Sequence, residues 1–285
     1  MIKIENLNYI YKKGLPDEKT ALTDINLEIE DGDFVAIIGH TGSGKSSLIQ
    51  HMNALIRPTS GKITIGGVDI TDKSVDLKSI RQRVGLVFQY PENQLFEETV
   101  YDDIAFGPKN SGLSDEEIKE RVYEAINLVN IDVSLLEKSP FELSGGQKRR
   151  VAIAGVLSMH PEILILDEPT AGLDPIGRDM LLELLTNLHK ETRITIIFVS
   201  HSMEDVAKVA NTVVVMNEGS IFAKGTVAEI FQKGDELVKI GLDVPQVTLL
   251  INKLNEMGAK LPKDIYTVKY AANILTDAMK GQKDV

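Results

Sequence analysis

Two kinds of hydrophobic pattern divide the chain. The first kind is almost uninterruptedly apolar and β-branched, at residues 33–39, 84–88, 162–168, 195–200 and 212–217. Such runs are typical of central parallel strands covered on both faces. The second kind alternates apolar with polar residues, at 3–9, 25–31 and 61–67. Alternation is typical of half-exposed antiparallel strands, so the pattern predicts a mixed α/β core with an antiparallel β region on its N-terminal side.

Helical patterns lie between the strands, and one has a clear start. Ser114 followed by Glu117 forms a capping box, and the residues after it make one apolar stripe: Ile118, Val122, Ala125, Ile126 and Val129. The composition changes near residue 235, and the segments 245–258 and 267–280 read as two amphipathic helices. We therefore predict a main domain over residues 1–234 and a helical C-terminal extension over residues 235–285.

A glycine-rich loop carries the strongest chemical signal. The stretch GHTGSGKS at 39–46 matches G-x-x-x-x-G-K-[ST], with a buried strand before it and a helical pattern after it. Backbone N–H groups of such a loop can point at phosphate oxygens. We expect Lys45 to reach the β- and γ-phosphates of a nucleotide and the Ser46 hydroxyl to ligate Mg²⁺.

An acidic pair completes this candidate site. Asp167 and Glu168 end the apolar run ILILDE. A bare Asp-Glu pair after a strand is often only a solvated strand end, but beside a phosphate loop it fits nucleotide hydrolysis. We expect Asp167 to hold Mg²⁺, directly or through water, and Glu168 to act as general base on the attacking water.

Charge and composition narrow the range of partners. The 285 residues carry a formal net charge of -11, and cysteine is absent. An acidic chain argues against a nucleic-acid surface, and the absence of thiols excludes a disulfide framework or thiolate metal site. We expect no signal peptide and no membrane-spanning segment, so any membrane role requires a partner.

Further motifs follow in an order that resembles the nucleotide-binding subunits of ABC transporters, over roughly residues 1–230. LSGGQ at 143–147 is similar to the family's signature motif, and AGLD at 171–174 to its D-loop. Gln89 resembles the Q-loop glutamine, His201 the switch histidine, and Tyr11 the aromatic that stacks on adenine. The resemblance implies a P-loop NTPase fold: an ABC ATPase core with a RecA-like mixed sheet, an antiparallel β subdomain and an α-helical signature subdomain.

The resemblance also implies a shared nucleotide site. In this family two subunits associate head to tail, and each ATP lies between the loop of one chain and the signature of the other. The expected ATP-binding residues are Tyr11, Gly39, His40, Thr41, Gly42, Ser43, Gly44, Lys45, Ser46, Ser47, Ser144, Gly145, Gly146, Gln147 and Asp174. Ser144, Gly145 and Gly146 would cap the γ-phosphate of the neighbour's ATP.

Catalytic and metal roles follow from the same resemblance. The expected catalytic residues are Lys45, Gln89, Glu168 and His201, and the expected Mg²⁺ ligands are Ser46, Gln89 and Asp167. His201 would contact the γ-phosphate and help to orient Glu168. The basic run at 148–150 is interpreted as helix-start solvation with contacts to a partner.

The segment FQYPENQLFEETVYDDIAFGP at 88–108 resembles the ATPases of energy-coupling factor transporters, and the chain looks like their second ATPase type. Such transporters take up vitamins or cobalt and nickel ions. The implied partners are a second ATPase subunit, an integral membrane scaffold (T) component and a substrate-binding (S) component. The chain would then be peripheral, at the cytoplasmic face of the cell membrane. Its C-terminal helices would either join the two ATPases or pack on the core.

Three alternatives stay open at this point. A soluble ABC ATPase could act on nucleic acid, although such proteins usually show two cassettes, coiled-coil insertions or zinc cysteines. The chain could serve another class of ABC importer, or bind ATP without hydrolysing it in a regulatory role. The transported substrate and the choice between homodimer and heterodimer are not encoded in a readable motif.

Overall fold

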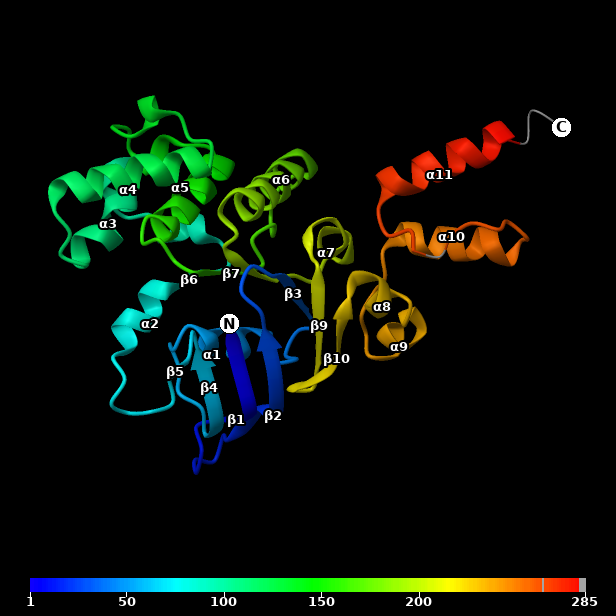
Figure 1. The fold of residues 1–285 in the computed structure, drawn as a ribbon, viewed down its shortest axis with the longest axis horizontal. Coiled ribbons are helices and arrows are strands. Elements are labelled where there is room, and N and C mark those ends of the chain that lie inside the picture. Colours follow the sequence, from blue (N-terminus) through cyan, green and yellow to red (C-terminus); the bar gives the residue numbers. More distant parts are fainter. Residues whose placement is uncertain (263, 282–285) are drawn as a thin grey trace.

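A computed structural model describes residues 1–262 and 264–281 and shows two sheets with helices arranged around them (Figure 1). The larger, six-stranded sheet has the order β10-β9-β3-β8-β7-β6. Its strands are β3 (Phe34–Ile38), β6 (Val84–Val87), β7 (Ile163–Asp167), β8 (Thr195–Val199), β9 (Thr212–Asn217) and β10 (Ser220–Thr226). The five apolar runs are the parallel strands, as predicted, and β10 joins antiparallel to β9.

The alternating segments form a separate four-stranded antiparallel sheet, also as predicted. Its order is β2-β1-β4-β5, from β1 (Ile2–Tyr11), β2 (Lys19–Ile29), β4 (Ser60–Ile65) and β5 (Val68–Asp69). The central strand β3 explains how the layers meet. Val35 and Ile37 pack with the antiparallel sheet and helix α1 (Lys45–Met52), whereas Ala36 and Ile38 pack with the helices on the other face. Successive side chains of a strand point to opposite faces, so an uninterrupted apolar run serves both cores.

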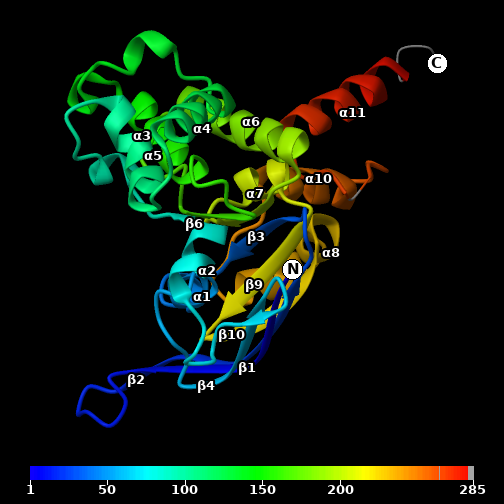
Figure 2. The same cartoon turned by 60° about the vertical axis from the view of Figure 1, so that its left-hand side comes forward.

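A helical subdomain lies beyond the sheet edge at β6, opposite the antiparallel sheet (Figure 2). It contains α3 (Val100–Asn110), α4 (Asp115–Leu128) and α5 (Gly145–Leu157), with short turns η1 (Pro91–Gln94), η2 (Val133–Leu135) and η3 (Pro140–Glu142). The capping box is present, because Ser114 Oγ accepts a hydrogen bond from Glu117 N while Glu117 Oε2 accepts one from Ser114 N. The whole predicted stripe of α4 is buried.

The remaining helices before the C-terminal region connect the strands. They are α2 (Leu77–Arg83), α6 (Pro175–Thr192), α7 (Met203–Val209), α8 (Val227–Phe231) and α9 (Gly234–Lys239). Across residues 1–262 and 264–281, no helix combines the length and the apolar character needed to cross a membrane.

Two C-terminal helices, α10 (Gln246–Glu256) and α11 (Val268–Gly281), stand at the predicted places (Figure 1). They have a small core of their own, with Val247, Ile251, Ile265 and Ala271. The main core continues through Leu237, Leu242 and Val244 and also takes Tyr266. The sequence predicts an apolar stripe on each helix, with Val247 and Leu250 on the first and Val268 and Met279 on the second. Val247 packs inward, whereas the exposed fractions of Leu250 and Val268 are 50% and 71%. The side chain of Met279 lies outside the described part.

Candidate active site

One cleft of about 590 Å³ gathers most of the predicted site residues. They come from the start of the chain, the glycine-rich loop and the ends of β6, β7 and β8: Tyr11, Thr41, Gly42, Gly44, Lys45, Ser46, Ser47, Gln89, Asp167, Glu168 and His201. Ligand sites of open α/β sheets lie outside the carboxyl ends of parallel strands, and this cleft occupies that place.

The remaining loop residues shape the loop rather than line the cleft. A Cβ atom at Gly39 would lie 2.5 Å from the Met216 carbonyl oxygen, so only glycine fits there. Ser43 is fully buried, and its Oγ has no hydrogen-bond partner within the described residues. The His40 ring contacts Asn217 Oδ1 through Nε2, at 3.1 Å. These residues therefore fix the backbone whose N–H groups face the cleft.

Lys45 is held inside the loop by backbone oxygens. Its Nζ donates to the carbonyl oxygens of Gly39, at 2.6 Å, and His40, at 3.2 Å. Burial lowers the pKa of the Lys45 ammonium, against the opposing attraction of Glu168 and Asp167. A nearby phosphate would favour the charged form, so the position suits an anionic ligand.

Asp167 and Ser46 offer a pair of oxygen ligands. Ser46 Oγ donates to Asp167 Oδ2 at 3.4 Å. Burial, followed by the charge of Glu168, raises the pKa of Asp167. No group of three or more His, Cys, Asp or Glu side chains suitable for a metal occurs among the described residues. Mg²⁺ is commonly held by one or two protein oxygens together with substrate phosphates and water, so this pair fits Mg²⁺.

Glu168 and His201 line the same cleft and contact each other. His201 Nδ1 lies 2.6 Å from Glu168 Oε2. Glu168 has a left-handed backbone, with φ of 51°, and its N–H donates to the Val199 carbonyl of β8 at 3.0 Å. Non-glycine residues in this conformation are uncommon and are often found at functional sites. The sharp turn ends β7 and brings the carboxylate beside the loop.

Tyr11 is fixed at the cleft by two neighbours. Its hydroxyl lies 3.0 Å from Ser47 Oγ, and its ring stands edge-on to Tyr9 with centroids 4.7 Å apart. Tyr9 in turn contacts the buried ring of His51, at 4.6 Å. Tyr11 thus presents a braced aromatic ring to the cleft, while Tyr9 connects that ring to the interior.

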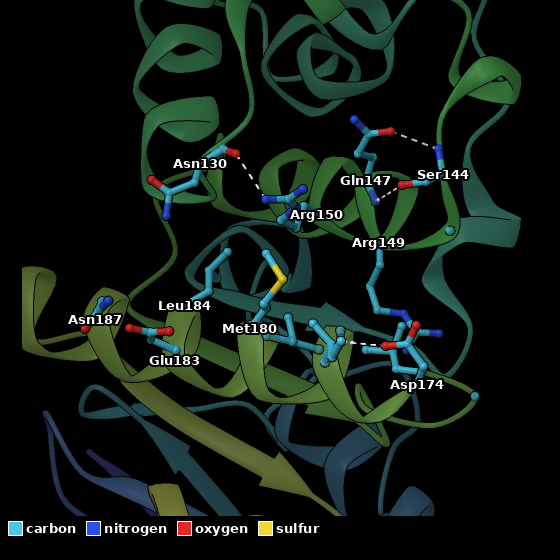
Figure 3. Close-up of a pocket in the computed structure, with 17 residues that line it drawn as sticks. Asn130, Ser144, Gln147, Arg149, Arg150, Asp174, Met180, Glu183, Leu184 and Asn187 are labelled. Carbon is cyan, nitrogen blue, oxygen red and sulfur yellow. Dashed lines mark hydrogen bonds between the residues drawn. The ribbon is translucent and has the colours of Figure 1, made fainter.

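A second cleft, of about 820 Å³, contains the LSGGQ turn (Figure 3). Ser144 Oγ accepts from Gln147 N at 3.3 Å, and Gln147 Oε1 accepts from Ser144 N at 2.9 Å, so the two residues cap α5. Asp174 lines the same cleft and caps α6 through Gly177 N, at 2.7 Å. Across the described chain, the two clefts have no lining residue in common.

Gly145 and Gly146 have open space where a side chain would stand, as far as the described residues show. A Cβ atom at either position would meet nothing within 4 Å in the part of the chain that the structure describes. Both have negative φ, and both lie in the first turn of α5. Alanine favours a helix over glycine by up to about 1 kcal/mol. Glycine is useful where a ligand or another backbone approaches closely.

Arg149 is buried, with an exposed fraction of 2%. The prediction that the run 148–150 is solvated is therefore wrong at this position. The Arg149 side chain pairs with Glu92, which the sequence did not single out. One signal was available, because Arg149, Ile153 and Leu157 follow one another at four-residue spacing on the buried face of α5.

The fold and the first cleft define a P-loop nucleoside triphosphatase. A family model described as "ABC transporter" matches residues 22–171. The energy-coupling factor transporter ATP-binding protein EcfA2 of Caldanaerobacter subterraneus subsp. tengcongensis is 56% identical over 284 residues, which cover 100% of this chain and 99% of the relative.

Solved structures agree with the sequence relatives. cbiO1 from Clostridium perfringens, described as part of the ABC transporter complex cbiONQ, has a TM-score of 0.75 and 41% identity, and the match covers 88% of this chain and 98% of that one. The ATP-binding cassette MJ0796, solved as a dimer bound to ADP and Pi, has a TM-score of 0.70 and 29% identity, with coverage of 80% and 99%.

The chain therefore belongs to the ABC transporter ATPase family, among the ATP-binding proteins of energy-coupling factor transporters. ATP hydrolysis coupled to transport is the activity of that family. The predicted ABC ATPase fold is confirmed, as is the second ATPase type, since this EcfA2 relative matches the chain over its whole length.

Proposed function

We propose that this chain closes head to tail on a second ATPase subunit, with each ATP held between the first cleft of one subunit and the LSGGQ turn of the other. The observation that carries the proposal is the pair of glycines, Gly145 and Gly146, which nothing in the described chain requires. A γ-phosphate reaching that turn from a partner would require them. The favourable dipole at the N-terminus of α5 and the free proton of the Ser144 hydroxyl would both serve an anion.

In the first cleft, Lys45 and the loop N–H groups hold the phosphates, and Tyr11 stacks on adenine. Two contacts support this assignment. The Tyr11 hydroxyl is held by Ser47, and the Lys45 ammonium is held by the Gly39 carbonyl inside the loop. Ser46 and Asp167 hold Mg²⁺, with Gln89 approaching the ion from the end of β6. When bound, Mg²⁺ neutralises charge that develops on the phosphate oxygens.

Glu168 accepts the proton of the attacking water. A general base of this kind accounts for roughly 10²–10⁴-fold in rate. The contact of 2.6 Å between Glu168 Oε2 and His201 Nδ1 supports His201 as the residue that orients the carboxylate. His201 is well exposed, which leaves its ring able to meet a γ-phosphate.

The segment after Gln89 is proposed as the surface that receives the membrane partner. It exposes Tyr90, Phe96 and Phe106, and the last two rings stand edge-on with centroids 4.9 Å apart. Exposed aromatic residues, two of them in contact, favour a protein contact over a nucleic-acid contact in a chain of net charge -11. The chain would thus sit at the cytoplasmic face of the membrane, beneath a scaffold component and a separate substrate-binding component, and power uptake of a vitamin or a cobalt or nickel ion.

The helical extension, residues 235–285, is proposed as a second contact between the two ATPases. Three apolar side chains on α10 and α11 are at least half exposed, although the two helices already share an internal core: Leu249, Leu250 and Val268. Such a contact would keep the subunits together when ATP leaves.

Cross-linking tests the shared site, and the chain has no cysteine to interfere. Thr41 and Ser144 are both exposed, one in each cleft. With Thr41→Cys in one subunit and Ser144→Cys in the other, added ATP and Mg²⁺ should produce a disulfide-linked dimer, in a Glu168→Gln background that retains ATP. The matched pair Thr41→Cys with Glu124→Cys should give no disulfide-linked dimer. Failure of the first pair to cross-link at any ATP concentration would remove the head-to-tail arrangement between two copies of this chain.

A further inference from the structure

Arg149 occupies an unusual position for an arginine. It lies one helical turn after Gly145 on the buried face of α5. Figure 3 shows its side chain extending from α5 toward the loop that precedes α6, whereas Arg150 turns toward Asn130. A buried charge requires partners, because its desolvation is otherwise strongly unfavourable.

The partners of Arg149 come from two separate loops. Nε and Nη2 donate to the two carboxylate oxygens of Glu92, at 3.0 and 2.7 Å. Nη1 donates to the carbonyl oxygens of Pro169, at 2.7 Å, and Ala171, at 2.9 Å. One planar guanidinium therefore joins both loops, and its rigid fork fixes them in relation to each other.

The two joined loops lie at different places: one is on the exposed segment after Gln89, and the other follows Glu168. Glu92 lies in η1, on the segment that exposes Tyr90 and Phe96. The other loop follows Glu168 directly and closes into a turn, because Ala171 N donates to the Glu168 carbonyl at 3.1 Å. A shift of either loop must move the guanidinium and, with it, the other loop.

The far end of the outer segment is also anchored. Asp103 of α3 accepts hydrogen bonds from the backbone N–H groups of Phe96 and Glu97, at 3.1 and 3.3 Å. The segment is thus held at Glu92 and again at Phe96. A force applied to its outer surface should displace it as one piece instead of bending it locally.

The geometry points to Arg149 as a positioning residue that transmits movement of η1 to the loop carrying Glu168. This inference rests on the proposed function, which takes η1 as the surface for the membrane partner and Glu168 as the base. The planar guanidinium of Arg149 makes four hydrogen bonds, two to each loop, so the junction is rigid. Contact with the membrane partner would thereby set the orientation of the Glu168 carboxylate and so the rate of hydrolysis.

The experiment compares ATP turnover with and without the membrane proteins. The complex is purified from its native membranes through a tag on this chain and reconstituted into vesicles, and the same chain is also assayed alone. Two variants loosen the junction: Glu92→Gln removes the carboxylate charge, and Arg149→Lys keeps the charge but loses the fork. The readouts are kcat, the KM for ATP and the ratio of kcat in vesicles to kcat of the isolated chain.

A matched pair of controls exists in the same molecule. Arg83 and Glu162 form a two-point ion pair of the same kind, with both contacts at 2.8 Å, at the start of β6 and β7. Neither residue lines either cleft in the described chain. Arg83→Lys and Glu162→Gln should keep the wild-type stimulation by the membrane proteins.

The two junction variants should lower that stimulation by about threefold to tenfold, which lies within the coupling that single residues carry between distant sites. The KM for ATP should stay within about twofold, because the phosphate loop is unchanged.

A stimulation equal to that of the controls in both variants would overturn the inference alone. Two other outcomes would overturn the proposed function instead. One is a wild-type turnover that is the same with and without the membrane proteins, and the other is a turnover that Glu168→Gln leaves unchanged. If Arg149→Lys unfolds in a thermal melt, Glu92→Gln still decides the question, since it leaves Arg149 bound to the two carbonyl oxygens.

Discussion

The two glycine-rich turns of this chain differ in what requires their glycines. In the first, a side chain at Gly39 or Gly44 would collide with the chain's own backbone. In the second, side chains at Gly145 and Gly146 would meet nothing in the described residues. The first turn is thus completed by its own fold, whereas the second is shaped for something that arrives from outside. Glycine without an internal reason is a sign of an intermolecular site.

Charge follows the same division. The first turn surrounds Lys45 and lies beside Asp167 and Glu168, the groups to which the proposed function assigns hydrolysis. The LSGGQ turn offers a capping box and a helix N-terminus. Under the proposed arrangement, a partial positive dipole and N–H groups are sufficient there, because the opposite subunit would supply a lysine. The first region would then carry the chemistry, and the second would complete the enclosure of the nucleotide.

The largest expected effect separates chemistry from binding in the first region. Glu168→Gln should lower ATP turnover by about 10²–10⁴-fold because the amide cannot accept the proton of water. ATP binding should persist, since Lys45 and the loop are unchanged. Phosphate release measures the first quantity and equilibrium binding of labelled ATP the second. Glu191→Gln, at an exposed position, serves as control. Unchanged turnover would show that Glu168 is not the base.

A pair of alanine variants tests the comparison of the turns directly. Gly39→Ala should destabilise the protein by about 1–3 kcal/mol, because the new methyl group has no room. Gly146→Ala should leave the stability equal or raise it by up to about 1 kcal/mol. Its turnover should nevertheless fall by about 10²-fold, because the new methyl group would hold the γ-phosphate away from a backbone N–H donor in the transition state.

Chemical denaturation and phosphate release measure these two properties for each variant. The comparison fails if Gly146→Ala keeps wild-type turnover at all protein concentrations, or if it loses as much stability as Gly39→Ala.

The smallest expected effect concerns Asp167 in the nucleotide-free protein. Burial and Glu168 raise the pKa of Asp167 in the folded state above its unfolded value. Its ionisation therefore opposes folding, fully above the folded pKa and not at all below the unfolded value of about 3.9. Asp167→Asn removes that charge, so the variant should melt at a higher temperature than the wild type at pH 7.

The gain should shrink as the pH is lowered through the folded pKa of Asp167, because the wild-type carboxyl then takes up a proton in the folded state. Thermal melts in a metal chelator at pH 7 and at successively lower pH values measure it. A gain independent of pH would mean that the charge of Asp167 is not its cause. In either case the variant should lose hydrolysis, because an amide is a weaker ligand for Mg²⁺ than a carboxylate.

Much of the fold could be predicted because its signals are local. The run ILILDE needs only its neighbours to be read as a buried strand, and Ser114 with Glu117 needs only four residues to start a helix. The phosphate loop and the acidic pair could be predicted for the same reason, since each is a contiguous motif. The choice of Asp167, Glu168 and His201 as neighbours followed from the order of the motifs, and the structure brings them into one cleft.

What escaped prediction depends on distant contacts. Glu92 and Arg149 are 57 positions apart, and neither belongs to a motif that announces the other. The edge strand β10 is short of apolar residues, and its pairing with β9 comes from the turn between them. Inside the phosphate loop, the inward turn of Ser43 depends on packing around Gly39, which the motif does not reveal.

The separation of the two clefts has a genetic consequence under the proposed arrangement. A mutation in the LSGGQ turn would leave the first cleft of the mutant chain intact. It would damage the nucleotide site that this turn completes on the other subunit. Where two copies of this chain pair with each other, mixed pairs of altered and normal copies would be impaired at the normal copy's nucleotide. Damage to this turn should therefore act in a dominant manner, in proportion to how often the two kinds of copy meet.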